Sequence, residues 1–375
     1  MTVVTGMHET YGARFRDRGS RRVVDDYGRP ERTHRAVRNG VGVIEMGYGV
    51  VVIEGDDRVE FVDDTVSNRV PATEGSGVYA LLLDPQGRID TDLYVYNAGE
   101  RLLCFTPPER APVVAREWAD NVFIRDVEVR EASAEFAVFG VHGPNSTEKV
   151  ASVLNGAASP EPELTFVRGS MGGEGVTVIA GDGLTGEEGY EIVCAADAAG
   201  RVFETLLSFG MNAVPFGYRT WETLTTEAGT PLFETELDDR LPNVLGLRNA
   251  LDFEKGCYVG QEVVSKVENR GRPSQRLVGL RLGSGADRNS DVGPDRLPGP
   301  GAAVTVDGDR IGEVTRSVES PSLEAPIALA LVDFDAGTES VSVAGDEGSI
   351  DATRTPLPFV DGSAASERLP SYPEA

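Results

Sequence analysis

The stretch KGCYVGQE, at residues 255–262, places a thiol between two glycines. Glycines let the backbone take positive φ angles or approach another group closely. If residues 262–267 form a helix and not a strand, Cys257 lies just before its N-terminus, where the helix dipole and Lys255 favour the thiolate. Glu254 and Glu262 oppose that shift. A small buried cysteine is the other interpretation that these residues leave open.

Length and composition define a broad class of protein. A chain of 375 residues is expected to fold as two or three domains. A hydrophobic content of 40% and a mean hydropathy of −0.20 are typical of a soluble globular protein. No apolar run has the length of a membrane span, and the first residues lack a signal-peptide pattern. We therefore expect a cytoplasmic protein without a membrane-embedded part.

The metal-binding residue types are few and scattered. The three cysteines are Cys104, Cys194 and Cys257, and the three histidines are His8, His34 and His142. Their spacing contains no CxxC pair, no disulfide framework and no histidine pair typical of zinc. The sequence therefore predicts no metal site and argues against a histidine-based catalytic triad.

The charge is strongly acidic, with a formal net charge of −26 and a pI near 4.5. Only three of the 35 basic residues are lysine. An acidic, lysine-poor surface suits a halophilic host with a salt-rich cytoplasm, where salt screens self-repulsion. This charge argues against general nucleic-acid binding, which needs a basic face. A local basic patch at Arg270, Arg272 and Arg276 could still contact nucleic acid or an anionic ligand tail.

A predicted hairpin carries the first candidate site. Residues 77–83 and 88–97 read as strands around a turn at residues 84–87, which has proline second and glycine fourth. Period-2 alternation places Asp92 on one face with Asp90, Tyr94 and Tyr96. A solvated sheet face and a weak metal-binding DxD are the alternatives.

Single polar residues supply further candidates. Glu191 lies inside an apolar strand, which is costly for a carboxylate unless an arginine or a ligand pairs with it. Arg219 falls in the first turn of a helix predicted for residues 215–228, where the helix dipole makes a cation unfavourable. A contact with a carboxylate or a ligand would explain it, and a surface arginine is the alternative. His142 follows a buried strand and is predicted to be a structural turn histidine.

The remaining segments set the outline of the fold. Residues 41–53 read as strand, and residues 283–301 as a mobile excursion rich in glycine and proline. Residues 302–343 carry short strands separated by turns, typical of a small β-barrel or sandwich. The polar tail from Asp361 is expected to be disordered.

In this order, these segments resemble the glycine-cleavage T-protein superfamily of tetrahydrofolate-binding aminomethyltransferases. The resemblance rests on HGP at residues 142–144, TGEEGYE at 185–191 and YRTWETL at 218–224. Within that superfamily, KGCYVGQE at residues 255–262 resembles the signature of the YgfZ-type branch.

The resemblance implies an α+β, three-domain, ring-like fold with ferredoxin-like lobes and a C-terminal β-barrel. Residues 1–50 and 136–270 would form a discontinuous folate-binding domain, with an inserted α+β domain at 51–135. The barrel would span residues 271–355, and a tail would follow at 356–375.

It also implies roles for individual residues. Asp92 would face the reactive N5/N10 region of folate, and Glu191 would grip the pterin. Arg219 and Tyr258 would also bind the cofactor. Asp92 and Cys257 would be the two catalytic residues, with Cys257 as a working thiol.

Three functions follow from the resemblance. The first is a YgfZ-type tetrahydrofolate-binding protein that supports assembly or repair of iron–sulfur enzymes, its clients. The second is a folate-dependent aminomethyltransferase or methyltransferase with a lipoyl carrier or a small amine as donor, and the third is a non-catalytic binding module. The family's Asp-Asp and Arg-Asp pairs are Thr91-Asp92 and Arg219-Thr220 here, which leaves enzyme status open.

Overall fold

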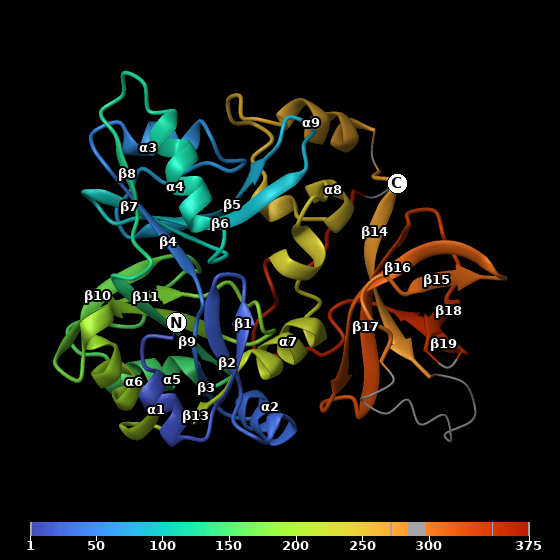
Figure 1. Cartoon of the computed structure of the whole chain (residues 1–375), viewed down its shortest axis with the longest axis horizontal. Helices are drawn as coiled ribbons and strands as arrows, with labels where there is room; N and C mark the ends of the chain where they lie inside the picture. The colour runs from blue at the N-terminus through green and yellow to red at the C-terminus, as the bar shows by residue number, and fades with distance from the viewer. Residues whose placement is uncertain (1, 271, 284–296, 347, 374–375) are drawn as a thin grey trace.

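A computed structural model of the chain describes residues 2–270, 272–283, 297–346 and 348–373. In this part of the chain the strands form two open sheets, a closed barrel and a hairpin of β1 (Arg14–Arg18) and β2 (Arg21–Asp26). Figure 1 shows the barrel on one side and the two open sheets on the other, with α7 and α8 between them. The predicted α+β fold with a C-terminal barrel is therefore confirmed.

The first open sheet has six strands in the order β10-β11-β12-β9-β3-β13. Helices pack on one of its faces over an apolar cluster that contains Phe139 and Phe203. The strands are β3 (Gly42–Glu45), β9 (Phe136–His142), β10 (Phe166–Met171), β11 (Glu174–Ala180), β12 (Gly189–Ala195) and β13 (Val214–Pro215). The helices of this part are α1 (Thr5–Thr10), α2 (Pro30–Arg38), α5 (Ser146–Val153), η1 (Ala196–Ala198) and α6 (Ala199–Ser208).

The second open sheet has five strands in the order β5-β6-β7-β4-β8. Its strands are β4 (Gly49–Glu54), β5 (Ser76–Leu83), β6 (Ile89–Asn97), β7 (Arg101–Thr106) and β8 (Glu128–Glu131). The helices α3 (Arg58–Asp63) and α4 (Ala111–Asp120) cover one face with a core around Trp118. The predicted hairpin is confirmed as β5 and β6.

Residues 41–53, predicted as strand, form two strands that lie in different sheets, β3 in the first and β4 in the second. Gly47 lies at the crossing and donates its backbone N–H to the Tyr218 hydroxyl at 2.8 Å. A Cβ at Gly47 would lie 2.9 Å from the Val23 side chain. The sequence did not reveal the crossing, because both strands are buried on both faces and neither shows the alternation that would mark it off from the other.

The barrel closes in the order β14-β17-β16-β15-β18-β19. Its strands are β14 (Gln275–Leu282), β15 (Ala303–Val306), β16 (Asp309–Ser320), β17 (Ala325–Asp333), β18 (Ser340–Gly345) and β19 (Gly348–Thr355). Most of the predicted excursion, residues 284–296, lies outside the described residues.

A mostly helical segment connects the first sheet to the barrel. It contains α7 (Tyr218–Glu227), η2 (Phe233–Leu237), α8 (Pro242–Leu245), η3 (Arg248–Ala250) and α9 (Gln261–Asn269). The residues after the cysteine loop are thus helical. One large apolar cluster joins this segment to both sheets and to the barrel, from Ile44 and Phe105 to Leu237 and Leu331.

The disorder expected for the tail is wrong, because residues 361–373 run back from the barrel across the molecule. The backbone N–H of Glu367 donates to the Asp182 carbonyl at 3.0 Å, and the N–H of Ser371 to the Gly246 carbonyl at 3.0 Å. The prediction of disorder rested on the polar composition of the tail, but backbone hydrogen bonds hold the tail against the rest of the protein. Within the described residues, no helix is both long and apolar enough to cross a membrane.

Candidate functional site

Two adjoining cavities lie where the open sheets, α7 and the tail meet. Both are lined by Tyr48, Tyr94, Phe105 and Leu184. The first extends to His142, Asp182 and Glu191 of the six-stranded sheet and its loops. The second extends to Asp92, Arg18, Trp221 and Arg368. We call the two together the central cavity.

Aromatic rings form much of its wall. Tyr94 and Tyr96 are stacked with ring centroids 6.1 Å apart and an interplanar angle of 11°. Tyr48 and Phe105 stack similarly, 5.7 Å apart at 8°. Such rings offer flat apolar surfaces to a heteroaromatic ligand.

Asp92 is buried on β6 and holds fixed partners with one of its two carboxylate oxygens. Its Oδ2 accepts hydrogen bonds from the Tyr79 hydroxyl at 3.2 Å and from Arg368 Nη1 at 2.9 Å. Its Oδ1 is buried without a hydrogen-bond partner among the described residues. This carboxylate is therefore oriented on one side and free on the other.

Arg368, on the tail, is a cation of the central cavity that sequence reasoning missed, as it missed Arg18. Its guanidinium lies 3.9 Å from the centroid of the Tyr79 ring and donates to the Tyr94 hydroxyl at 2.7 Å. Burial by itself lowers the pKa of Arg368, but the neighbouring Tyr79, Tyr94 and Asp92 raise it above its ordinary value. No local pattern in a polar tail signals such a contact.

Glu191 lies on β12 and is 9% exposed. Its Oε1 accepts a long hydrogen bond of 3.5 Å from Tyr48, and its Oε2 is buried without a partner in the described part of the chain. Burial, with the nearby charge of Asp182, raises the pKa of Glu191 to about 8. The sequence left open an internal arginine as the partner of Glu191, and no arginine is among its described contacts. Because its pKa is raised, the Glu191 carboxyl that faces the central cavity is protonated at neutral pH.

Two other predicted residues lie elsewhere. The Arg219 side chain is 57% exposed, and its Nη2 lies 3.6 Å from Asp25 Oδ2. Asp90, which alternation placed beside Asp92, pairs with Arg110. Of the arginines that the structure describes, Arg18 and Arg368 line the central cavity. The predicted role of Arg219 in cofactor binding stays a prediction.

Cys257 and Tyr258 belong to the loop before α9 and do not appear among the described residues that line the central cavity. Cys257 is exposed, whereas Cys104 and Cys194 are buried. Lys255 anchors the loop, because its buried Nζ donates to the carbonyls of Val66 and Asn68 at 3.0 and 2.9 Å. The structure therefore separates the two residues predicted to be catalytic, Asp92 and Cys257.

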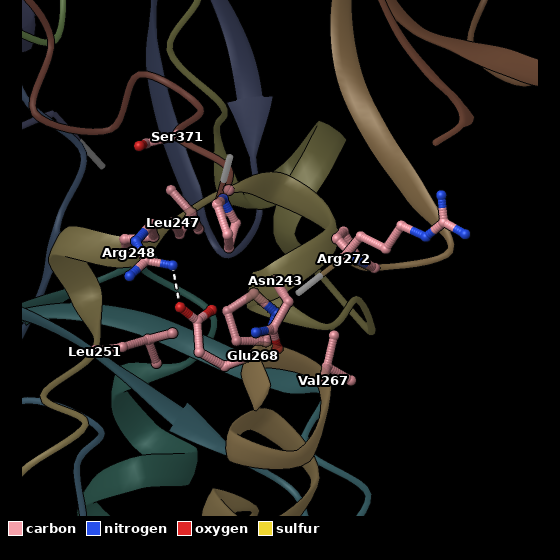
Figure 2. A pocket seen from close by; sticks show the side chains of 12 residues that line it. Asn243, Leu247, Arg248, Leu251, Val267, Glu268, Arg272 and Ser371 are labelled. Atoms are coloured by element: carbon pink, nitrogen blue, oxygen red, sulfur yellow. Dashed lines mark hydrogen bonds and ion pairs between the residues drawn. The ribbon is translucent and has the colours of Figure 1, made fainter. Parts of the chain in front are cut away.

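Arg272 of the predicted basic patch also lies apart from the central cavity. Arg272 lies beside a different, small pocket between residues 242–251, α9 and the tail. Figure 2 shows its side chain directed away from the ion pair of Arg248 and Glu268 that this pocket contains. The Arg272 guanidinium pairs instead with Asp335 of the barrel.

Together these features define an α+β protein built around a buried aromatic cavity lined by three carboxyl groups, those of Asp92, Asp182 and Glu191. Residues 4–255 match the GCVT N-terminal domain family, and residues 276–361 match the glycine cleavage T-protein C-terminal barrel domain. The chain therefore belongs to the glycine-cleavage T-protein family.

Individual relatives agree with this assignment. An aminomethyltransferase of Cutibacterium acnes is 31% identical, over 96% of this chain and 97% of the relative. An aminomethyltransferase of Geobacillus kaustophilus is 30% identical, over 87% of this chain and 89% of the relative. The crystal structure of the glycine cleavage system aminomethyltransferase T of Bartonella henselae shares the fold, with a TM-score of 0.83, 22% identity and coverage of 97% and 98%. These matches define the family and not a branch within it.

Proposed function

We propose that the chain binds a reduced folate in the central cavity and acts as a folate-dependent aminomethyltransferase or methyltransferase. One observation carries this proposal: Glu191 and Asp92, from two different sheets, each present a buried carboxyl oxygen without a partner in the described structure. Buried polar atoms are nearly always hydrogen-bonded, so a ligand with matching donors is their natural partner. The similarity to proteins named aminomethyltransferase favours this function over the iron–sulfur role.

A pterin offers the hydrogen-bond donors that a carboxylate at Glu191 would accept. Its ring N–H and exocyclic amine stand side by side, and one carboxylate can accept both. Tyr94, Tyr96 and Phe105 would offer ring surfaces to the flat heterocycle. Glu191 would then orient the ligand, and burial of the site would exclude water.

Asp92 would act at the reacting end. Its Oδ2 is fixed by Tyr79 and Arg368, which leaves Oδ1 to position an attacking amine or to stabilise positive charge that develops there. Bound tetrahydrofolate supplies the nitrogen atoms that accept the one-carbon unit. Asp92 would therefore matter more for turnover than for affinity, and Glu191 the reverse.

Calorimetric titration with 5-formyl-tetrahydrofolate in molar KCl tests the binding part. We expect saturable binding by the wild type and at least about tenfold weaker binding by Glu191→Gln, a difference of about 1.4 kcal/mol. Asp90→Asn is the matched control, because Asp90 lies on the same strand but pairs with Arg110. Absence of binding by folded wild-type protein would overturn the proposal.

A transfer assay tests the reaction. With a lipoyl carrier or a small amine as donor, Asp92→Asn should lose most of its turnover while it still binds the folate. A variant that keeps full turnover would exclude Asp92 as a catalytic residue.

A second candidate function rests on the cysteine loop. Cys257 is the exposed thiol of the three, on a loop that buried Lys255 anchors. We propose as the alternative a YgfZ-type role, in which folate binding supports iron–sulfur client enzymes and Cys257 is the working thiol. Cys257→Ala would then abolish client activity in cells and Asp92→Ala would not, whereas the transferase predicts the opposite pattern.

A further inference from the structure

His142 is buried at the end of β9, where it lines the central cavity together with Glu191. Its Nε2 is buried, and neither ring nitrogen has a hydrogen-bond partner in the part of the chain that the structure describes. Its ring packs edge-on against Trp221, with centroids 5.1 Å apart, and against Phe216 at 6.2 Å. The turn role predicted from sequence therefore does not account for this side chain, since His142 ends a strand.

The register of the sheet explains how the imidazole is held. Glu191 pairs with Gly140, and His142 pairs with Gly189, so the two side chains stand diagonally on one face with glycines at the other two corners. A Cβ on Gly140 would lie 2.5 Å from the His142 Nε2, and a Cβ on Gly189 would lie 2.5 Å from its Nδ1.

The backbone does not need these two glycines, because neither has a positive φ angle. Their missing side chains instead leave the space that the imidazole ring occupies. Glycine inside a strand often marks a place where another group approaches closely. The floor of the central cavity is thus shaped to hold one imidazole beside one carboxyl group.

The chemical state of His142 suits recognition of a ligand. Burial lowers the pKa of His142 to about 3, so the ring is neutral at physiological pH. A neutral imidazole carries one N–H donor and one acceptor nitrogen. A purely structural ring at this position would be served better by phenylalanine, which packs in the same way and buries no unpaired nitrogen.

We propose that His142 is a specificity-determining residue. It forms a hydrogen bond, as donor or as acceptor, with a nitrogen heterocycle whose neighbouring edge is bound by Glu191. The ligand class is a flat heterocycle whose adjacent edge groups meet the carboxyl and the imidazole together, as the N–H and carbonyl of a 4-oxo-pteridine do. The inference rests on the proposed folate function and adds a second recognition residue to it.

Two substitutions separate recognition from packing. His142→Phe keeps the aromatic packing and removes both nitrogens, whereas His142→Gln keeps a donor and an acceptor. In titrations with 5-formyl-tetrahydrofolate in molar KCl, we expect His142→Phe to bind at least about tenfold more weakly than the wild type, about 1.4 kcal/mol. His142→Gln should recover most of that loss, which a merely structural role would not predict.

Nitrogen-15 NMR of histidine-labelled protein gives a readout that does not depend on any variant folding. The chain has three histidines. His8 bonds Tyr27 and Glu45, each at 2.7 Å, and His34 bonds Glu227 at 2.9 Å. On addition of 5-formyl-tetrahydrofolate, the ring-nitrogen signals of His142 should shift while the other two histidines keep theirs.

The outcomes distinguish the role of His142 from the folate function. Wild-type binding that is lost in Glu191→Gln but unchanged in folded His142→Phe would overturn the role of His142 alone. His142 signals that stay in place at saturation would overturn that role as well. Absence of wild-type binding would overturn the folate function and the role of His142 together.

Discussion

Arg368 Nη1 lies 2.9 Å from Asp92 Oδ2, although 276 residues separate them in sequence. Both side chains are almost fully buried. The pair ties the tail to the five-stranded sheet at the wall of the central cavity. It thereby fixes one oxygen of the proposed catalytic carboxylate and balances part of its charge.

Removal of this arginine should destabilise the fold. Arg368→Met leaves Asp92 as a buried carboxylate without its charged partner, which typically costs about 3–5 kcal/mol. Urea denaturation in molar KCl would measure this loss in the free energy of unfolding.

The double variant Asp92→Asn/Arg368→Met gives the control for that loss. It should be more stable than Arg368→Met alone, because it carries no unpaired charge. Equal stability of Arg368→Met and the wild type would contradict a buried ion pair at this place.

Local patterns account for the parts of the site that sequence predicted. The alternation on β6 placed Asp92 with Tyr94 and Tyr96, and the apolar strand around Glu191 marked that carboxyl as unusual. Both signals lie within a few residues of the side chain concerned. The turn of the hairpin, from Asp84 to Gly87, was equally local.

The parts that sequence did not predict depend on distant contacts. Arg368 reaches the cavity only because the tail crosses from the barrel, and polar composition does not encode that route. His142 faces Glu191 because β9 pairs with β12 in one register, which a single strand does not specify. Arg219 lies in the stretch YRTWETL, which resembles a motif of the family, yet its position on α7 places its guanidinium beside Asp25 and not among the described residues of the central cavity.

The raised pKa of Glu191 predicts a pH-dependent affinity. With a pKa of about 8, Glu191 holds a proton at neutral pH in the empty cavity. A pterin that donates two N–H groups requires the carboxylate, so binding releases that proton. The affinity for 5-formyl-tetrahydrofolate should therefore rise with pH, by up to roughly tenfold per pH unit below about 8, and level off above it.

Calorimetry in buffers of different ionisation enthalpy would measure the released proton directly. Glu191→Gln supplies the control, because its weak binding should show neither the pH dependence nor the proton release. A wild-type affinity that stays constant across this pH range would argue that Glu191 is already ionised or does not contact the ligand.

The anchoring of the cysteine loop predicts a change in thiol reactivity. Lys255 Nζ donates to the carbonyls of Asp63, Val66 and Asn68 at 2.5, 3.0 and 2.9 Å. Lys255→Met keeps the side-chain length but leaves these acceptors unpaired, which should lower the stability by about 1–3 kcal/mol. The loop should also loosen, so a thiol reagent should modify Cys257 faster.

Thiol titration of the folded protein makes this measurable, since one thiol should react rapidly in the wild type. Cys104 and Cys194 are buried, and burial raises the pKa of both thiols, to about 12 for Cys194. Lys266→Met on α9 is the matched control, because that lysine is exposed and its removal should change neither rate nor stability. Unchanged labelling of Cys257 in Lys255→Met would mean that contacts other than the lysine hold the loop in place.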